Sequence, residues 1–187
     1  MLYYFFRIQF LVIVIFLISC SKQEQQTEKV SAGNNFLWTE QISLDKIPSF
    51  SIKGSLNGKE FKAEYINMEF WRGTNDYVLY FGSKKPSQKC GYPGEDESAF
   101  RLIRKSSEFK TGTIVKDTFD KNVEGIIADF HYYLGKDNTQ NTGAQWNCAL
   151  EITEINEQTV KGRIALCFKD DAKSWLAGTF ESIRCYY

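Results

Sequence analysis

Alternation of apolar and polar residues toward the C-terminal end is the feature that most limits how this chain can fold. Every second residue is apolar from 146 to 152, and every second residue is apolar or glycine from 160 to 168. A period of two places these side chains on one face of a β-strand, whereas a helix would need a period of 3.6. A polar turn at 156–158 separates the two segments, so we expect them to pair as antiparallel neighbours. A last strand is predicted from Trp175 to Arg184.

Shorter segments upstream show the same pattern. Residues 50–56 alternate and are followed by Asn57-Gly58, a strong hairpin signal because both residues tolerate positive φ. The returning strand changes parity near Tyr65, which predicts a β-bulge. Further strands are predicted at 77–81, 99–104, 111–115 and 125–134. Eight or nine short strands without helical periodicity predict a mainly β domain, either an antiparallel β-sandwich or a barrel.

The N-terminal segment has the layout of a secretory signal. Residues 8–18 are apolar apart from Gln9, and Arg7 supplies a positive charge before them. The segment ends in Leu17-Ile-Ser-Cys20, which resembles the lipobox of bacterial lipoproteins. The resemblance implies cleavage after residue 19 and attachment of lipid to Cys20, so that the partner of this end is a membrane. The alternative is a plain signal peptide or an uncleaved membrane anchor.

Composition then divides the chain into three parts. Residues 1–19 are predicted to be a lipoprotein signal peptide, and residues 20–45 a flexible tether, since the polar stretch after Cys20 has too few apolar residues to fold. Residues 46–187 are predicted to form a single β-rich domain. The resemblance places the chain in the cell envelope of a Gram-negative bacterium, anchored in the outer membrane on its periplasmic or outer face.

Cysteines provide a second constraint. Cys90, Cys148, Cys167 and Cys185 are an even number in an exported chain, which predicts two disulfides. A zinc site is disfavoured, because the spacings are wide and His131 is the single histidine. Cys148 and Cys167 lie at the same end of the predicted meander, while Cys185 has run back to the other end. We therefore predict Cys148–Cys167 and Cys90–Cys185 bridges, although the parity of the first pair requires a bulge or twist.

Charge and motifs indicate few chemical functions. The chain has 23 basic and 23 acidic residues without a basic stripe, so a nucleic acid partner is not expected. His131 and Asp129 share one face of a predicted strand, but no nucleophile motif accompanies them, and a surface histidine is the simpler interpretation. Residues 137–143 only faintly resemble a calcium loop and are predicted to be a polar turn. We predict no catalytic residues, no metal site and no cofactor.

Aromatic residues make up 16% of the chain. Their functional interpretation is a stacking platform for sugars or a surface for a protein partner, while the structural one is that aromatic side chains suit strands and fill β cores. The structural interpretation is favoured here. The clusters are Tyr65, Phe70, Trp71, Tyr77 and Tyr80, and then Tyr132, Tyr133 and Trp146 around the polar turn.

Four short segments carry a further resemblance. They are Thr111-Gly-Thr113, Leu150-Glu-Ile-Thr153, Val160-Lys-Gly-Arg-Ile164 and Gly178-Thr-Phe180. Together they resemble the closing strands of uncharacterised small lipoproteins of Gram-negative envelopes, which implies a β-rich domain and no known activity. The expected function is a lipid-anchored, non-enzymatic binding or structural module with a protein or glycan partner. An exported inhibitor of a host or rival enzyme, such as a lysozyme inhibitor, is the first alternative, and a hydrolase the second.

Overall fold

The computed structural model describes residues 35–91, 94, 96–141 and 143–186. Their regular structure consists of eleven strands and one short 3₁₀ helix, η1 (Leu44–Lys46). The long strands fall where apolar and polar residues alternate, and the prediction of a mainly β domain is confirmed. The strands are β1 (Lys53–Leu56), β2 (Lys59–Lys62), β3 (Tyr65–Trp71), β4 (Asp76–Gly82), β5 (Ala99–Arg104), β6 (Gly112–Lys116), β7 (Ile126–Leu134), β8 (Asp137–Asn141), β9 (Trp146–Ile155), β10 (Thr159–Phe168) and β11 (Trp175–Cys185).

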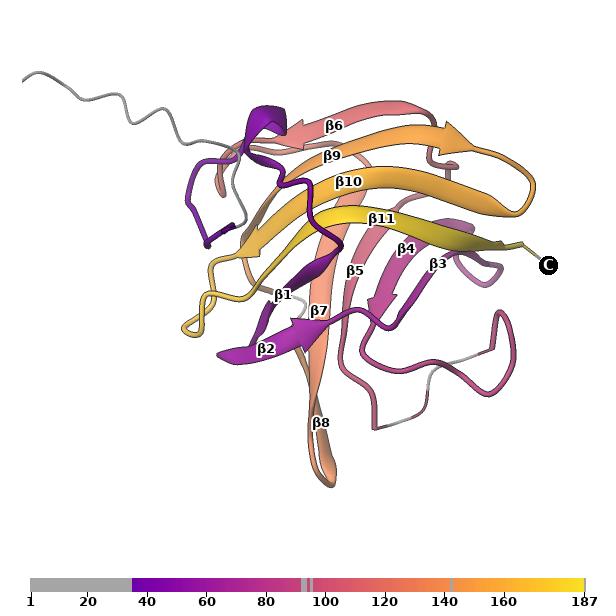
Figure 1. The fold of residues 1–187 in the computed structure, drawn as a ribbon, viewed down its shortest axis with the longest axis horizontal. Helices are drawn as coiled ribbons and strands as arrows, with labels where there is room; N and C mark the ends of the chain where they lie inside the picture. Colours follow the sequence, from indigo (N-terminus) through magenta and orange to yellow (C-terminus); the bar gives the residue numbers. More distant parts are fainter. Residues whose placement is uncertain (1–34, 92–93, 95, 142, 187) are drawn as a thin grey trace, which may run out of the picture. The chain divides into compact units, whose positions relative to one another are not determined.

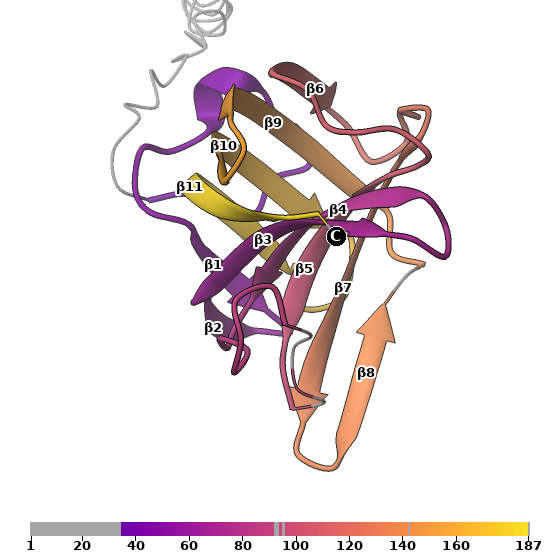
Figure 2. The same cartoon turned by 90° about the vertical axis from the view of Figure 1, so that its right-hand side faces the viewer.

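All of these strands belong to one curled sheet. Neighbours follow the order β6-β9-β10-β11-β3-β4-β5-β7-β8, and β1 pairs with both β11 and β2 beside that row. The sheet bends around on itself into a half-barrel, as Figures 1 and 2 show. The barrel-like form of the prediction is therefore confirmed. The pair of β11 and β3 is parallel, however, and the alternation pattern gave no sign of this.

The main core fills the concave face of the sheet. Phenylalanine rings from opposite walls meet there, with centroids 5.9 Å apart for Phe100 and Phe168 and 5.5 Å apart for Phe81 and Phe180. Each fully buried apolar side chain of this size contributes roughly 1.5–3 kcal/mol. The alternate side chains point to the opposite, convex face.

On the convex side, β9, β10 and β11 present small side chains to the segment that precedes β1. Ala149, Ala165 and Ala177 leave room for Phe36 and Ile42, which are 8% and 2% exposed. The small residues thus let a second layer of chain approach the sheet closely.

An amide side chain fixes that segment. Nδ2 of Asn147, a buried residue of β9, donates hydrogen bonds of 3.0 and 2.9 Å to the carbonyl oxygens of Thr39 and Glu40. Residues 36–47 therefore belong to the folded domain. The predicted tether of 20–45 was too long, because the few apolar residues near its end are enough to dock on an existing sheet even though they could not form a core alone.

The parity change near Tyr65 has a different cause from the predicted bulge. β2 ends at Lys62 and β3 begins at Tyr65, and the two strands pair with different partners: β2 with β1, and β3 with β4 and β11. The chain breaks between two strands, so that the prediction of a bulge at this point was wrong. A register shift does occur between Lys161 and Gly162 of β10, in its ladder with β9.

The cysteines confirm one predicted bridge and contradict the other. Cys90 and Cys185 form a disulfide with an S–S distance of 2.05 Å. Cys148 and Cys167 are both free and buried. Cys148 of β9 lies opposite Leu166 of β10, so these two side chains point to the same face of the sheet. Cys167 follows Leu166 in the sequence, and its side chain therefore points to the other face. The pleat therefore keeps the two thiols on opposite sides of the sheet, and no bulge brings them together.

Within the described part of the chain, no helix is long and apolar enough to cross a bilayer. The predicted signal peptide and Cys20 lie outside the described residues.

Candidate functional site

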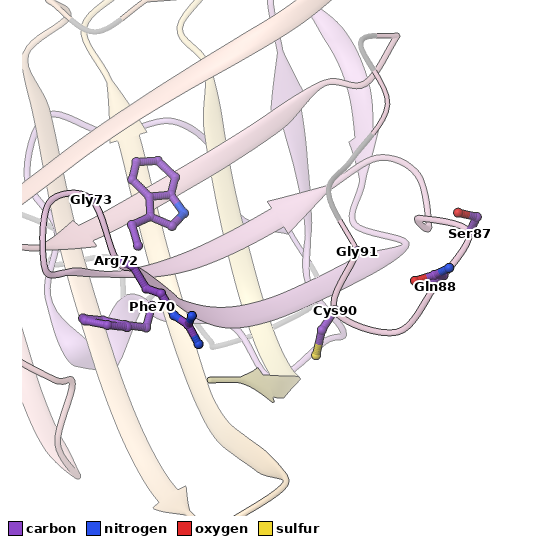
Figure 3. Close-up of a pocket in the computed structure, with 8 residues that line it drawn as sticks. Phe70, Arg72, Gly73, Ser87, Gln88, Cys90 and Gly91 are labelled. Atoms are coloured by element: carbon purple, nitrogen blue, oxygen red, sulfur yellow. The ribbon is translucent and has the colours of Figure 1, made fainter. Parts of the chain in front are cut away.

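A groove with a volume of about 720 Å³ lies beside the end of β3. One wall is the end of β3 with the turn that follows it, and the other wall is the loop between β4 and β5. Figure 3 shows Arg72 extending from the first wall toward the loop that carries Cys90. We call this hollow the β3 groove. Its lining residues are Phe70, Trp71, Arg72, Gly73, Ser87, Gln88, Cys90 and Gly91.

The disulfide holds the loop wall in place. Cys185 is the last residue of β11 and lies opposite Glu69 in the parallel ladder with β3. Its bond to Cys90 therefore ties the loop to the sheet directly beside the other wall. A turn in which the Gly91 amide donates to the Gln88 carbonyl at 2.9 Å shapes the loop further. Residues that are 14 or more positions apart in sequence meet here because a strand pair and a covalent bond bring them together.

Trp71 is held from two sides on the convex face. Its indole Nε1 donates a 2.5 Å hydrogen bond to Oε1 of Glu69, and the guanidinium of Arg101 lies 5.7 Å from its ring centroid. Arg101 is itself fixed by Asp129, to which its Nε and a terminal nitrogen donate bonds of 2.5 and 2.8 Å. This two-point pairing has little freedom, because both side chains are largely buried, with 14% and 6% exposed. The indole is therefore preorganised.

Phe70, the other aromatic residue of the groove, is supported from the concave side. Its ring is 4.9 Å from that of Tyr77 on β4, which in turn meets Tyr186 edge to face at 5.4 Å. The Tyr186 hydroxyl lies 3.0 Å from the sulfur of Met68. The ring of Phe70 therefore points to the concave face, opposite to that of Trp71, and is packed against partners contributed by the fold.

A buried carboxyl group lies at the base of the loop. Glu97 has no exposed surface, and neither of its carboxyl oxygens has a hydrogen-bond partner among the described residues. Glu97 fills the space that a side chain at position 82 would need. A Cβ atom added to Gly82 would lie 1.9 Å from Oε1 of Glu97. Burial raises the pKa of Glu97 to about 7, against a smaller opposing effect of the Tyr80 hydroxyl. Burial and the Glu97 charge also raise the pKa of Tyr80.

His131 and Asp129 do not form a catalytic pair in which His131 is the general base and Asp129 orients its imidazole. They share the convex face of β7, but the Asp129 carboxylate is engaged by Arg101, and no hydrogen bond joins it to His131 in the described structure. Burial, followed by the charge of Arg101, lowers the pKa of His131. The imidazole packs near Tyr80 instead, with ring centroids 6.5 Å apart.

The aromatic residues noted in the sequence separate into structural and exposed groups. Tyr65 and Tyr80 are buried on the convex face, Trp146 is in the main core, and only Phe70 and Trp71 reach the β3 groove. Tyr132 and Tyr133 line a second hollow of about 150 Å³ between the β1–β2 hairpin and β7. That volume is below the usual range of small-molecule sites.

Metal and thiol chemistry have no arranged site in the described residues. No group of three or more His, Cys, Asp or Glu side chains is placed to hold a metal ion there. Burial raises the pKa of both free thiols, that of Cys167 to about 12, so neither is a thiolate near neutral pH.

The polar turn predicted at residues 137–143 is a strand over most of its length. Residues 137–141 form strand β8, which pairs with β7 in a hairpin.

Sequence reasoning missed most of the groove. Arg72, Ser87 and Gln88 lie in a turn and a loop without a motif, and Glu97 reads as one charge in an acidic loop.

Comparison with models of protein families, with curated proteins and with solved structures finds no match for this chain. The geometry of the groove therefore carries the functional argument.

Proposed function

We propose that the chain is a lipid-anchored module of the bacterial cell envelope that binds a ligand in the β3 groove and performs no chemistry of its own. The groove is the observation that carries this proposal. Its volume of about 720 Å³ lies within the range of ligand sites, and its walls combine aromatic rings with polar groups. The supports behind Trp71 lower the cost of ordering this wall on binding.

Two features favour an exported module over a hydrolase. The disulfide suits an oxidising compartment such as the periplasm. The titratable groups near the groove are engaged in ways that suit structure: Asp129 pairs with Arg101, and Glu97 is sealed from solvent. Neither carboxyl group is placed to activate a nucleophile in the groove.

Anchoring is tested by following the full chain in its own bacterium. We expect mass spectrometry to find an acylated N-terminal Cys20, and a Cys20→Ala variant to move from the membrane fraction to the soluble fraction. A mature chain that begins at another residue, or a variant that stays in the membrane, would refute the lipid anchor.

Binding is tested with a chain that starts at residue 21, since the core of residues 36–186 is complete without the lipid. We expect it to co-sediment with envelopes isolated from the parent bacterium, and Trp71→Ala to reduce the bound fraction. Tyr133→Ala is the matched control, because Tyr133 is 39% exposed and lies on β7, away from the groove. Equal loss in both variants, or loss in neither, would contradict the proposal.

A further inference from the structure

We infer that the ligand of the β3 groove is an oligosaccharide, bound against Trp71 and hydrogen-bonded by polar side chains of the two walls. The inference rests on the proposed function and adds the chemical class of the ligand. It follows from three properties of the groove: a rigidly held indole, polar side chains on both walls, and a strand edge that is too short for a peptide.

The indole of Trp71 suits the apolar face of a sugar ring. The face of an aromatic ring carries partial negative charge and attracts the positively polarised C–H groups of a pyranose ring. Such a contact is most effective when the aromatic side chain is already fixed. Trp71 is fixed by Glu69 and Arg101, and Arg101 by Asp129. Arg101 and Asp129 are therefore positioning residues that do not themselves line the groove.

The polar walls suit the hydroxyl groups of sugars. Gln88 provides an amide that both donates and accepts, Ser87 a hydroxyl, and Arg72 a planar set of donors that matches neighbouring hydroxyl oxygens. Gln88 and Ser87 are exposed, and no hydrogen bond of either side chain to a described residue is present. Hydroxyl-rich ligands need several such partners, because burial of an unpaired hydroxyl is costly.

An extended peptide fits the same groove less well. Peptides that bind beside strands do so by adding a strand to a free edge. β11 ends opposite Glu69, so only Phe70 and Trp71 of β3 run beyond it. The Trp71 carbonyl already accepts the amide of Thr74 in the following turn at 3.1 Å. The free edge is therefore shorter than a strand needs.

The inference is tested by calorimetric titration of the chain from residue 21 with three separate saccharides: chitotetraose, cellotetraose and a galacturonic acid tetramer. We expect saturable binding of at least one of them. Gln88→Ala should weaken it about fivefold, as expected for one lost hydrogen bond, and Trp71→Ala roughly tenfold or more. Gln158→Ala is the matched control for Gln88→Ala, because Gln158 is an exposed glutamine in the β9–β10 turn.

Failure of the inference is distinct from failure of the proposed function. If no saccharide binds, or if tetra-alanine binds in the groove and the saccharides do not, the inference is wrong. It is also wrong if binding of a saccharide is unchanged by both groove variants. If envelope co-sedimentation still depends on Trp71 in any of these cases, the proposed function stands with another ligand. Gln88→Ala keeps the test valid if Trp71→Ala fails to fold, since Gln88 is an exposed loop residue.

Discussion

The carboxyl group of Glu97 lies beside the hydroxyl of Tyr80 on the convex face of the sheet, and both are sealed from solvent without a hydrogen-bond partner among the described residues. Such a buried acid is costly in its ionised form. The folded state therefore holds a proton that the unfolded chain releases. The charge of Asp96 raises the pKa of Glu97 and Lys84 lowers it, and these two residues form an ion pair with each other at the surface.

This arrangement predicts how stability depends on pH. The pKa of Glu97 rises from 4.5 to about 7 on folding. The contribution of Glu97 to the free energy of unfolding is therefore fully present below about pH 4.5 and is lost as the pH rises to about 7. We expect Glu97→Gln to abolish this loss, so that the free energy of unfolding of wild type falls by about 2–3 kcal/mol relative to the variant between pH 5 and pH 8.

Urea unfolding of both proteins at each pH measures this difference. The comparison cancels the opposite contribution of His131, whose lowered pKa favours folding as pH rises. Glu60→Gln, at an exposed position on β2, is the control and should follow wild type. Parallel stability curves for wild type and Glu97→Gln would contradict the account.

The disulfide predicts a second effect. The Cys90→Ser, Cys185→Ser double variant should unfold more easily than wild type by about 2–4 kcal/mol, because the bond closes a loop of 95 residues. It should also lose binding in the β3 groove, since the loop wall is no longer tied to β11. Reductant should destabilise wild type but leave the double variant unchanged.

Thiol counting on the same proteins checks the pairing. In a chain that starts at residue 21, unfolding without reductant should expose two thiols, Cys148 and Cys167. Four labelled thiols, or a peptide that links Cys148 to Cys167, would show that the pairing is wrong.

The segment before β1 predicts a third effect. Ile42→Ala should lower the free energy of unfolding by about 2–4 kcal/mol, because Ile42 is 2% exposed and packs against the small residues of β9–β11. Leu37→Ala is the matched control, since Leu37 is 76% exposed. Equal stability of the two variants would mean that this segment is a tether after all. Thermal unfolding followed by circular dichroism is sufficient to separate them.

Much of the sheet was predictable because its physical basis is local. Alternation located β9, β10 and β11 nearly to the residue, and the Asn57-Gly58 turn located the β1–β2 hairpin. The same alternation already argued against a Cys148–Cys167 bridge. That prediction failed because sequence distance along a hairpin was given more weight than the face on which each thiol lies.

The groove could not be predicted because the interactions that form it are not local in the sequence. Its two walls, at 70–73 and 87–91, meet through the parallel pairing of β11 with β3 and through the Cys90–Cys185 bond. The bond was predicted, but its consequence for Gln88 and Arg72 depends on the parallel pair, which leaves no periodic signal in the sequence. Trp71 was noted as one aromatic residue among many. Its supports, Arg101 and Asp129, come from strands that become neighbours only in the folded sheet.

The most direct test of the account is to map where an envelope ligand contacts the domain. Backbone amide NMR shifts of the chain from residue 21 would be recorded during titration with saccharides extracted from envelopes of the parent bacterium. We predict that the largest changes fall in residues 70–73 and 87–91, and that the ligand concentration at half-saturation rises about fivefold in Gln88→Ala and roughly tenfold or more in Trp71→Ala. Changes centred on Tyr132 and Tyr133 at the second hollow would contradict the claim that the β3 groove is the binding site, and no changes at saturating extract would contradict the claim that its ligand is an oligosaccharide.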